Sequence, residues 1–150
     1  MDQEENAHYQ KHQADALTQL DTLHKRAVNV LLRCKTVFPF DLFPNTLIID
    51  FNKVDIIYSN FFGSSQTVSI PIQRLNHISV DSVLFLSTLR IEVKGMDKNP
   101  PPLHSLMSKD AHLAKNIILG LMSASANGID LSHLQSREAI EKLIEIGQSV

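Results

Sequence analysis

The chain has 150 residues, of which 14 are Lys or Arg and 16 are Asp or Glu, so its formal net charge is −2. This balance argues against a nucleic-acid partner, because phosphate contacts need a basic excess. The single cysteine, Cys34, excludes a disulfide framework and a multi-cysteine zinc site. No apolar run approaches the roughly 18 residues that span a bilayer, and the acidic start MDQEEN does not resemble a secretory signal. We therefore expect a globular, cytoplasmic protein.

Residues 1–36 contain neither Pro nor Gly, and their apolar side chains recur every three or four positions. This spacing predicts one long amphipathic helix. Its apolar stripe consists of Leu17, Leu20, Leu23, Ala27, Val30, Leu31 and Cys34. The stripe is suited either to packing on the chain's own domain or to pairing with a second copy as a short coiled coil.

The pattern changes at the segment FPFDLFP (38–44), whose two prolines cannot continue a helix. Beyond it, apolar residues alternate with polar ones, which predicts half-buried antiparallel strands. The clearest strand has Phe85, Ser87, Leu89, Ile91 and Val93 on its inward face. The predicted strands cover 47–50, 54–58, 68–72, 78–80 and 85–93, with an edge strand over 103–107.

The last part of the sequence returns to helical spacing. A helix is predicted over 109–126, begun by Ser108 and ended by Asn127-Gly128. Its apolar stripe can cover the dry face of the strands. After a connector, a short helix is predicted to carry Ala139, Ile140, Leu143 and Ile144. The expected organisation is therefore a helix (1–36), a domain (37–128), and a connector with a short C-terminal helix (129–150).

Two stretches of this α+β pattern resemble the bacterial pleckstrin-homology-like (PH-like) domains. Residues 46–57 read as an apolar pair of strands around an Asp-x-x-Lys turn, and residues 68–80 are similar to the centre of that family. The resemblance covers about residues 40–128. It implies a small antiparallel barrel, or two orthogonal sheets, capped by the helix at 108–126. It also implies a role in binding, because the matching motifs contain no catalytic residue.

The resemblance does not extend to the ligand of the phosphoinositide-binding relatives. Those domains gather Lys and Arg beside the first hairpin, whereas here Lys53 is flanked by Asp50 and Asp55. A polyphosphate head group needs several converging cations. We therefore expect no such ligand from this hairpin.

Signals for catalysis are weak. His8 and His12 share a helix face without an assured third metal ligand, and the other histidines are dispersed. Cys34 would act as a nucleophile only with a histidine nearby. No phosphate-binding glycine loop or catalytic-serine motif is present. We expect no enzyme, no cofactor and no metal site; a small metal-dependent or hydrolytic enzyme is the third hypothesis.

The residues that suggest binding are aromatic and basic. Phe61 and Phe62 stand at a predicted hairpin tip, where they either bind a partner or close the end of the barrel. The leading hypothesis is a non-enzymatic scaffold that binds proteins or itself through this tip or through Leu17, Leu20, Leu23, Val30 and Leu31. The alternative is peripheral attachment to the inner face of the membrane. Its candidate residues are Lys25, Arg26, Arg33, Lys35, Phe38, Phe40 and Phe43.

Overall fold

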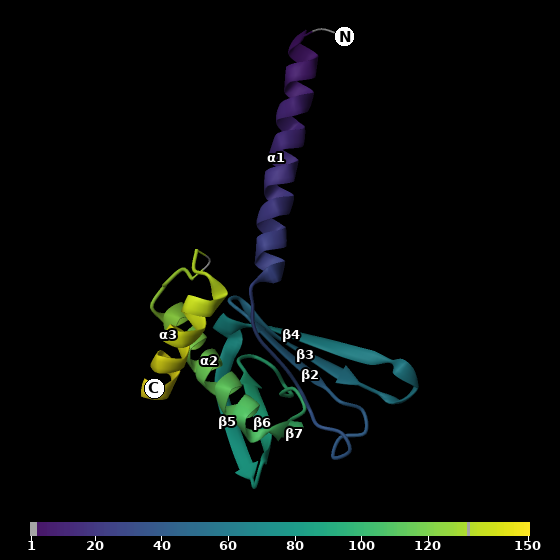
Figure 1. Ribbon diagram of the computed structural model, residues 1–150, viewed down its shortest axis with the longest axis vertical. Helices are drawn as coiled ribbons and strands as arrows, with labels where there is room; N and C mark the ends of the chain where they lie inside the picture. The colour runs from purple at the N-terminus through teal and green to yellow at the C-terminus, as the bar shows by residue number, and fades with distance from the viewer. Residues whose placement is uncertain (1–2, 132) are drawn as a thin grey trace.

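The computed structural model describes residues 3–131 and 133–150, with the side chains of 3–7 and 22–28 left out of the description. Figure 1 shows a long first helix, two sheets, and two helices at the C-terminal end. The helices are α1 (Gln3–Val28), α2 (Ser108–Ala126) and α3 (Ser136–Ser149). The strands are β1 (Val30–Lys35), β2 (Thr46–Asp50), β3 (Lys53–Ser59), β4 (Ser65–Pro71), β5 (Leu75–Val83), β6 (Leu86–Val93) and β7 (Leu103–Met107). Two short 3-10 helices, η1 (Phe61–Gly63) and η2 (Ile72–Arg74), lie on either side of β4.

The strands form two separate antiparallel sheets. One has the order β1-β2-β3-β4 and the other has the order β5-β6-β7. The predicted α+β class and the antiparallel strands are confirmed. The closed barrel, which was one of the two expected forms, is not present among the described residues.

The first helix is shorter than predicted. It ends at Val28, and Val30–Lys35 is the edge strand β1, paired with β2. The ladder shifts register between Val30 and Leu32, so Leu31 is an extra, buried residue in a bulge. Because of this bulge, the buried residues Leu31 and Cys34 are three positions apart, which imitates helical spacing. The helix prediction over 1–36 was therefore wrong for Val30, Leu31 and Cys34.

The core lies between the sheets and α2, as the sequence predicted for the helix at 109–126. The inward positions Leu47, Ile49, Val54 and Ile56 of the first sheet are at most 1% exposed. The buried face of α2 contributes Ala111, Ala114, Ile117, Ile118 and Leu121 to the same cluster. Burying each large aliphatic side chain contributes about 1.5–3 kcal/mol, so this cluster is the main source of stability.

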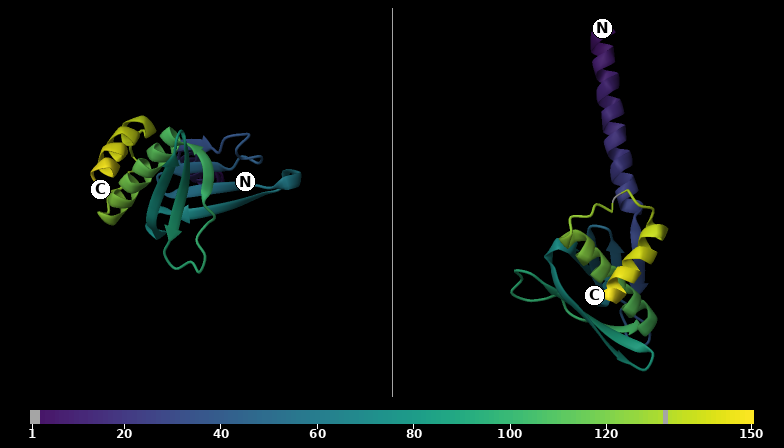
Figure 2. Two further views of the ribbon diagram at one scale, coloured as in Figure 1. Left: turned by 90° about the horizontal axis from the view of Figure 1, so that it is seen from below. Right: turned by 90° about the vertical axis from the view of Figure 1, so that its left-hand side faces the viewer.

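The helix α3 packs along α2 and also contacts β1 at the edge of the first sheet (Figure 2). Two glycines allow a very close crossing. A Cβ atom on Gly120 would lie 2.3 Å from the Leu143 carbonyl oxygen, and one on Gly147 would lie 2.0 Å from the Asn116 carbonyl oxygen. The backbones of the two helices therefore touch without intervening side chains.

The helix α1 projects away from the rest of the chain (Figures 1 and 2). Every described side chain on it, from residue 8 to residue 21, is exposed. Leu17 is 66% exposed and Leu20 is 61% exposed. Packing of the stripe on its own domain, one of the two predicted alternatives, is therefore not seen at Leu17 and Leu20, whereas Leu31 and Cys34 of the same stripe are buried in the core as part of β1. No described helix has the length and apolarity needed to cross a bilayer.

Candidate functional site

Three chain connections bring aromatic side chains to one end of the molecule. The β1–β2 loop (36–45) and the β3–β4 connection (60–64) lie at the same end of the antiparallel sheet. The two sheets meet here, because the Val37 amide donates to the Ser105 carbonyl at 2.8 Å and the Tyr58 hydroxyl donates to the Pro101 carbonyl at 2.7 Å. The β5–β6 turn of the second sheet reaches the same loop through a ring contact described next.

The rings form two groups of edge contacts, and the β1–β2 loop contributes one ring, Phe40 or Phe43, to each group. The ring centroids of Phe40 and Phe85 are 6.2 Å apart, and those of Phe43 and Phe61 are 5.5 Å apart. Phe61 and Phe62 follow at 4.3 Å. We call the whole patch the aromatic surface; its exposed members are Phe38, Phe40, Leu42, Phe43, Phe61, Phe62, Val83, Leu84 and Phe85. Of the predicted residues, the structure thus brings Phe43 together with Phe61 and Phe62, whereas Phe40 contacts Phe85 and Phe38 is exposed on the same loop as Phe40.

These side chains do not close the end of the fold. Phe62 is 93% exposed and Leu84 is 89% exposed. Both have positive φ angles, 68° and 57°, a region that non-glycine residues rarely adopt and that costs energy. Phe85 was predicted to face inward, but it precedes β6 and is 55% exposed. It was misassigned because the turn at Leu84 contains no glycine or proline to mark it.

The β1–β2 loop is held in place by Asp41. One carboxylate oxygen accepts from the Thr36 hydroxyl at 2.6 Å and from the Asn45 side-chain amide at 3.3 Å. The other oxygen accepts from the backbone N–H of Phe43 at 3.1 Å. Thr36 is 3% exposed, so this network is anchored in the core. The loop is therefore preorganised, with its rings directed outward.

A second network holds the β5–β6 hairpin against the start of α2. The Ser87 hydroxyl donates to the Ser108 hydroxyl at 2.8 Å and lies 2.7 Å from the Ser82 hydroxyl. Ser82 in turn lies 3.1 Å from Nε2 of His112. The Ser108 amide also donates to the Phe85 carbonyl at 2.9 Å. These contacts fix Phe85 beside the first turn of α2. The sequence gives no sign of this network, because Ser108 is 21 positions after Ser87 in the chain.

The basic residues predicted for membrane attachment are divided between α1 and β1. Lys25 and Arg26 belong to the last turns of α1, and their side chains lie outside the description. Val30 pairs with Asp50, so α1 joins the sheet at the β2–β3 end, about 20 Å from the loop end along β1. Arg33 and Lys35 are exposed on β1, and only Lys35 adjoins the loop.

The predicted apolar stripe is also divided. Leu17 and Leu20 are exposed on α1, whereas the Leu23 side chain lies outside the description. Val30 is 40% exposed and Leu31 is 6% exposed, both on β1. Among these residues, only Leu17 and Leu20 are shown to be exposed on the same helix.

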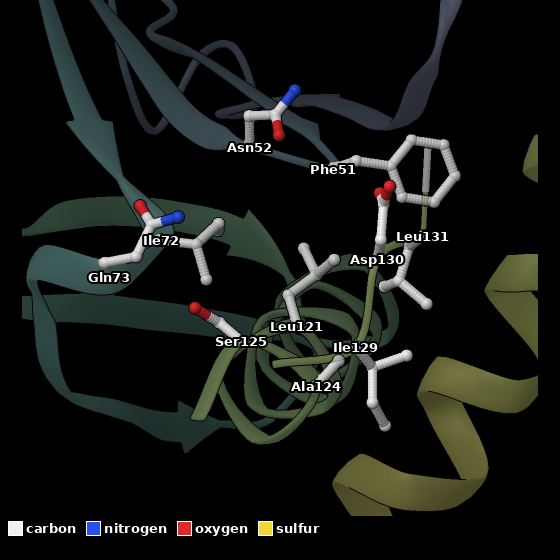
Figure 3. A pocket seen from close by; sticks show the side chains of 10 residues that line it. All are labelled: Phe51, Asn52, Ile72, Gln73, Leu121, Ala124, Ser125, Ile129, Asp130 and Leu131. Carbon is white, nitrogen blue, oxygen red and sulfur yellow. The ribbon is translucent and has the colours of Figure 1, made fainter. Parts of the chain in front are cut away.

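A small cavity of about 180 Å³ lies at the opposite end of the sheets from the aromatic surface (Figure 3). It is formed by the β2–β3 turn, η2, the end of α2 and the connector that follows. Its polar side chains are Asn52, Gln73, Ser125 and Asp130. A neighbouring hollow of about 320 Å³ shares Ile72, Gln73 and Ser125 and adds Lys94. Among the described residues, Asp130 is the one ionisable group that lines the first cavity. Nε2 of His133 lies 3.7 Å from its carboxylate, but both side chains are largely exposed and His133 is not part of the cavity lining, so the cavity itself does not enclose an acid–base pair.

The other candidates for catalysis are also placed unfavourably. Burial raises the pKa of the Cys34 thiol to about 12, with a smaller contribution from the charge of Asp110, so the thiolate is scarce at neutral pH. The rings of His8 and His12 stack at 4.5 Å on the exposed face of α1. Within the described part of the chain, no three His, Cys, Asp or Glu residues are arranged to hold a metal ion.

Comparison with known proteins gives no relative: no family model, no curated protein and no solved structure matches the chain.

Proposed function

We propose that this chain is a non-enzymatic, PH-like binding module and that the aromatic surface is its docking element. The order of elements supports the fold part of this proposal. Sheets of four and three antiparallel strands are followed by a helix that packs over them. The bacterial PH-like domains, which residues 40–128 resemble, have the same succession of strands followed by a closing helix.

The observation that carries the docking role is the set of nine exposed apolar residues supplied by three separate connections. Large contiguous apolar patches are uncommon on soluble monomers and mark interaction sites. Phenylalanine rings bury a large apolar area, so their exposure is costly without a partner. The Asp41 network keeps the loop ordered. Binding therefore costs little conformational entropy.

The proposal is tested by photo-crosslinking in the source cell. We replace Phe62 with p-benzoylphenylalanine, which reacts with C–H bonds of any molecule that covers it. The matched control carries the same group at Met96, which is 42% exposed but lies outside the aromatic surface.

We expect adducts at position 62, and we expect Phe61→Ser in the same chain to reduce their yield severalfold. The protein or lipid character of the adducts identifies the class of partner. Equal adduct yields at positions 62 and 96 would contradict the docking role.

Self-association through α1 is a second candidate function. The side chains of residues 8–21 are exposed, including Tyr9, Leu17 and Leu20. A solitary helix in water gains no packing energy from its apolar face, and most helical stability in proteins comes from such packing. A second copy would supply that packing for Leu17 and Leu20.

Deletion of residues 1–28 tests this candidate. The cut must stop before β1, because Val30–Lys35 is part of the first sheet. We expect the intact chain to sediment as a dimer, and we expect the shortened chain to be a monomer with an unchanged melting temperature. Leu17→Ser/Leu20→Ser should have the same effect on mass. A monomeric intact chain at all accessible concentrations would contradict self-association.

A further inference from the structure

We infer that the aromatic surface docks on the surface of an anionic lipid bilayer. This inference rests on the proposed docking role and names the partner. It depends on the shape of the surface and on the placement of the charges around it.

The surface consists of protruding tips rather than a groove. Phe62 and Leu84, at the tips of two hairpins, are the most exposed of its members. None of its residues lines either of the two cavities described above. A folded protein partner would need matching hollows for tips on three separate connections. The interfacial region of a bilayer accepts such apolar projections without a preformed shape.

The charges at this end favour an anionic surface. Asp41 is the one ionisable residue in the three connections (36–45, 60–64 and 82–87). Its carboxylate is engaged by three donors within its own loop, from Thr36, Phe43 and Asn45.

The borders of the surface carry two exposed lysines. Lys35 precedes the β1–β2 loop, and Lys109 is in the first turn of α2, next to Ser108, whose amide binds Phe85. Asp110, the acid beside Lys109, lies close enough to the buried Cys34 thiol to affect its pKa. The rim therefore carries two exposed cations, whereas Asp110 is half-buried and Asp81, the acid before Ser82, is paired with Arg90. A lysine near an anionic leaflet adds about a fivefold gain in binding.

The position of α1 is compatible with docking of the aromatic surface on a bilayer. The helix joins the sheet at the β2–β3 end, opposite to the loops that carry the aromatic surface (Figure 1). With the rings in the interface, α1 extends away from the bilayer. Its exposed Leu17 and Leu20 would then stay accessible to another copy of the chain.

The test is co-sedimentation of the full chain with vesicles of phosphatidylcholine alone and with vesicles that also contain phosphatidylglycerol. Phe61→Ser/Phe62→Ser removes two tips, and Lys35→Glu/Lys109→Glu reverses the two rim charges. The matched controls are Met96→Ser/Ile129→Ser, two exposed apolar residues at other sites, and Arg137→Glu/Lys142→Glu, two exposed cations on α3. Thermal unfolding of each variant verifies that it is folded.

We expect the intact chain to bind the mixed vesicles and to be released by salt. The double serine variant should bind about tenfold more weakly to both vesicle types or worse. The double glutamate variant should lose about tenfold on the mixed vesicles only. Both controls should bind like the intact chain.

Two results would overturn the inference: no binding by the intact chain, or equal binding by the double serine variant and the intact chain. If vesicle binding is absent but position 62 crosslinks to a protein in the cell, the docking role stands and the bilayer is the wrong partner. If both experiments are negative, the docking role falls as well.

Discussion

Gly120→Ala is expected to lower the free energy of unfolding by about 2–3 kcal/mol. The added Cβ would lie 2.3 Å from the Leu143 carbonyl oxygen and 2.9 Å from the Leu143 carbonyl carbon. Both atoms belong to the backbone in the middle of α3, so no side-chain rotation can make room. The helix must instead move away from α2, which uncovers the buried residues Ala139 and Leu143.

Chemical denaturation measures this effect. Alanine has a higher helix propensity than glycine by about 1 kcal/mol, so without the helix contact the substitution would stabilise the chain. Glu141→Ala, an exposed change on α3, is the control and should alter stability by less than about 0.5 kcal/mol. A Gly120→Ala protein as stable as the natural chain would show that the close crossing of the two helices is absent.

The strands could be predicted because their burial alternates. From Ser87 to Val93, every second residue of β6 is buried, as the sequence indicates. The strand β1 could not be predicted in the same way, because the bulge at Leu31 changes its burial period. Because α1 directly precedes β1, the three-residue spacing of Leu31 and Cys34 reads as a continuation of the helix.

The close contact of α2 and α3 left only a faint signal. Gly120 and Gly147 are isolated glycines inside helical patterns, which is typical of a close backbone approach. The sequence alone does not say which element approaches them. That depends on the connector after α2, where Asn127-Gly128 ends the helix as predicted and Gly128 has a φ of 65°.

The candidate site was predicted in part. The hairpin tip at Phe61 and Phe62 could be inferred from the glycine that follows them. The contact of Phe40 with Phe85 could not be inferred, because these residues lie in connections that belong to different sheets. The turn at Leu84 is also hidden, since leucine is not a residue that favours a positive φ.

The arrangement of the basic residues also could not be predicted from the sequence. A continuous helix over 1–36 would have placed Lys25, Arg26, Arg33 and Lys35 on one rod next to the Phe-rich segment. The break at Asn29 instead directs α1 away from the strand that leads to this segment. Of these four residues, only Lys35 borders the aromatic surface, and it is joined there by Lys109, which is 74 positions later in the sequence.

The docking of the aromatic surface on an anionic bilayer is tested most directly by a single tryptophan at its tip. The natural chain contains no tryptophan, so Phe62→Trp introduces one fluorophore at a position that is 93% exposed. The control is Tyr9→Trp, at a position on α1 that is 69% exposed. Both proteins are mixed with phosphatidylcholine–phosphatidylglycerol vesicles whose acyl chains carry bromine, which quenches fluorescence by contact.

For Phe62→Trp, the emission should shift to shorter wavelength and be quenched severalfold, because the ring enters the apolar part of the interface. For Tyr9→Trp, the emission should keep the wavelength and intensity it has in water. An unchanged spectrum for Phe62→Trp, with no more quenching than in the control, would contradict bilayer docking through the aromatic surface.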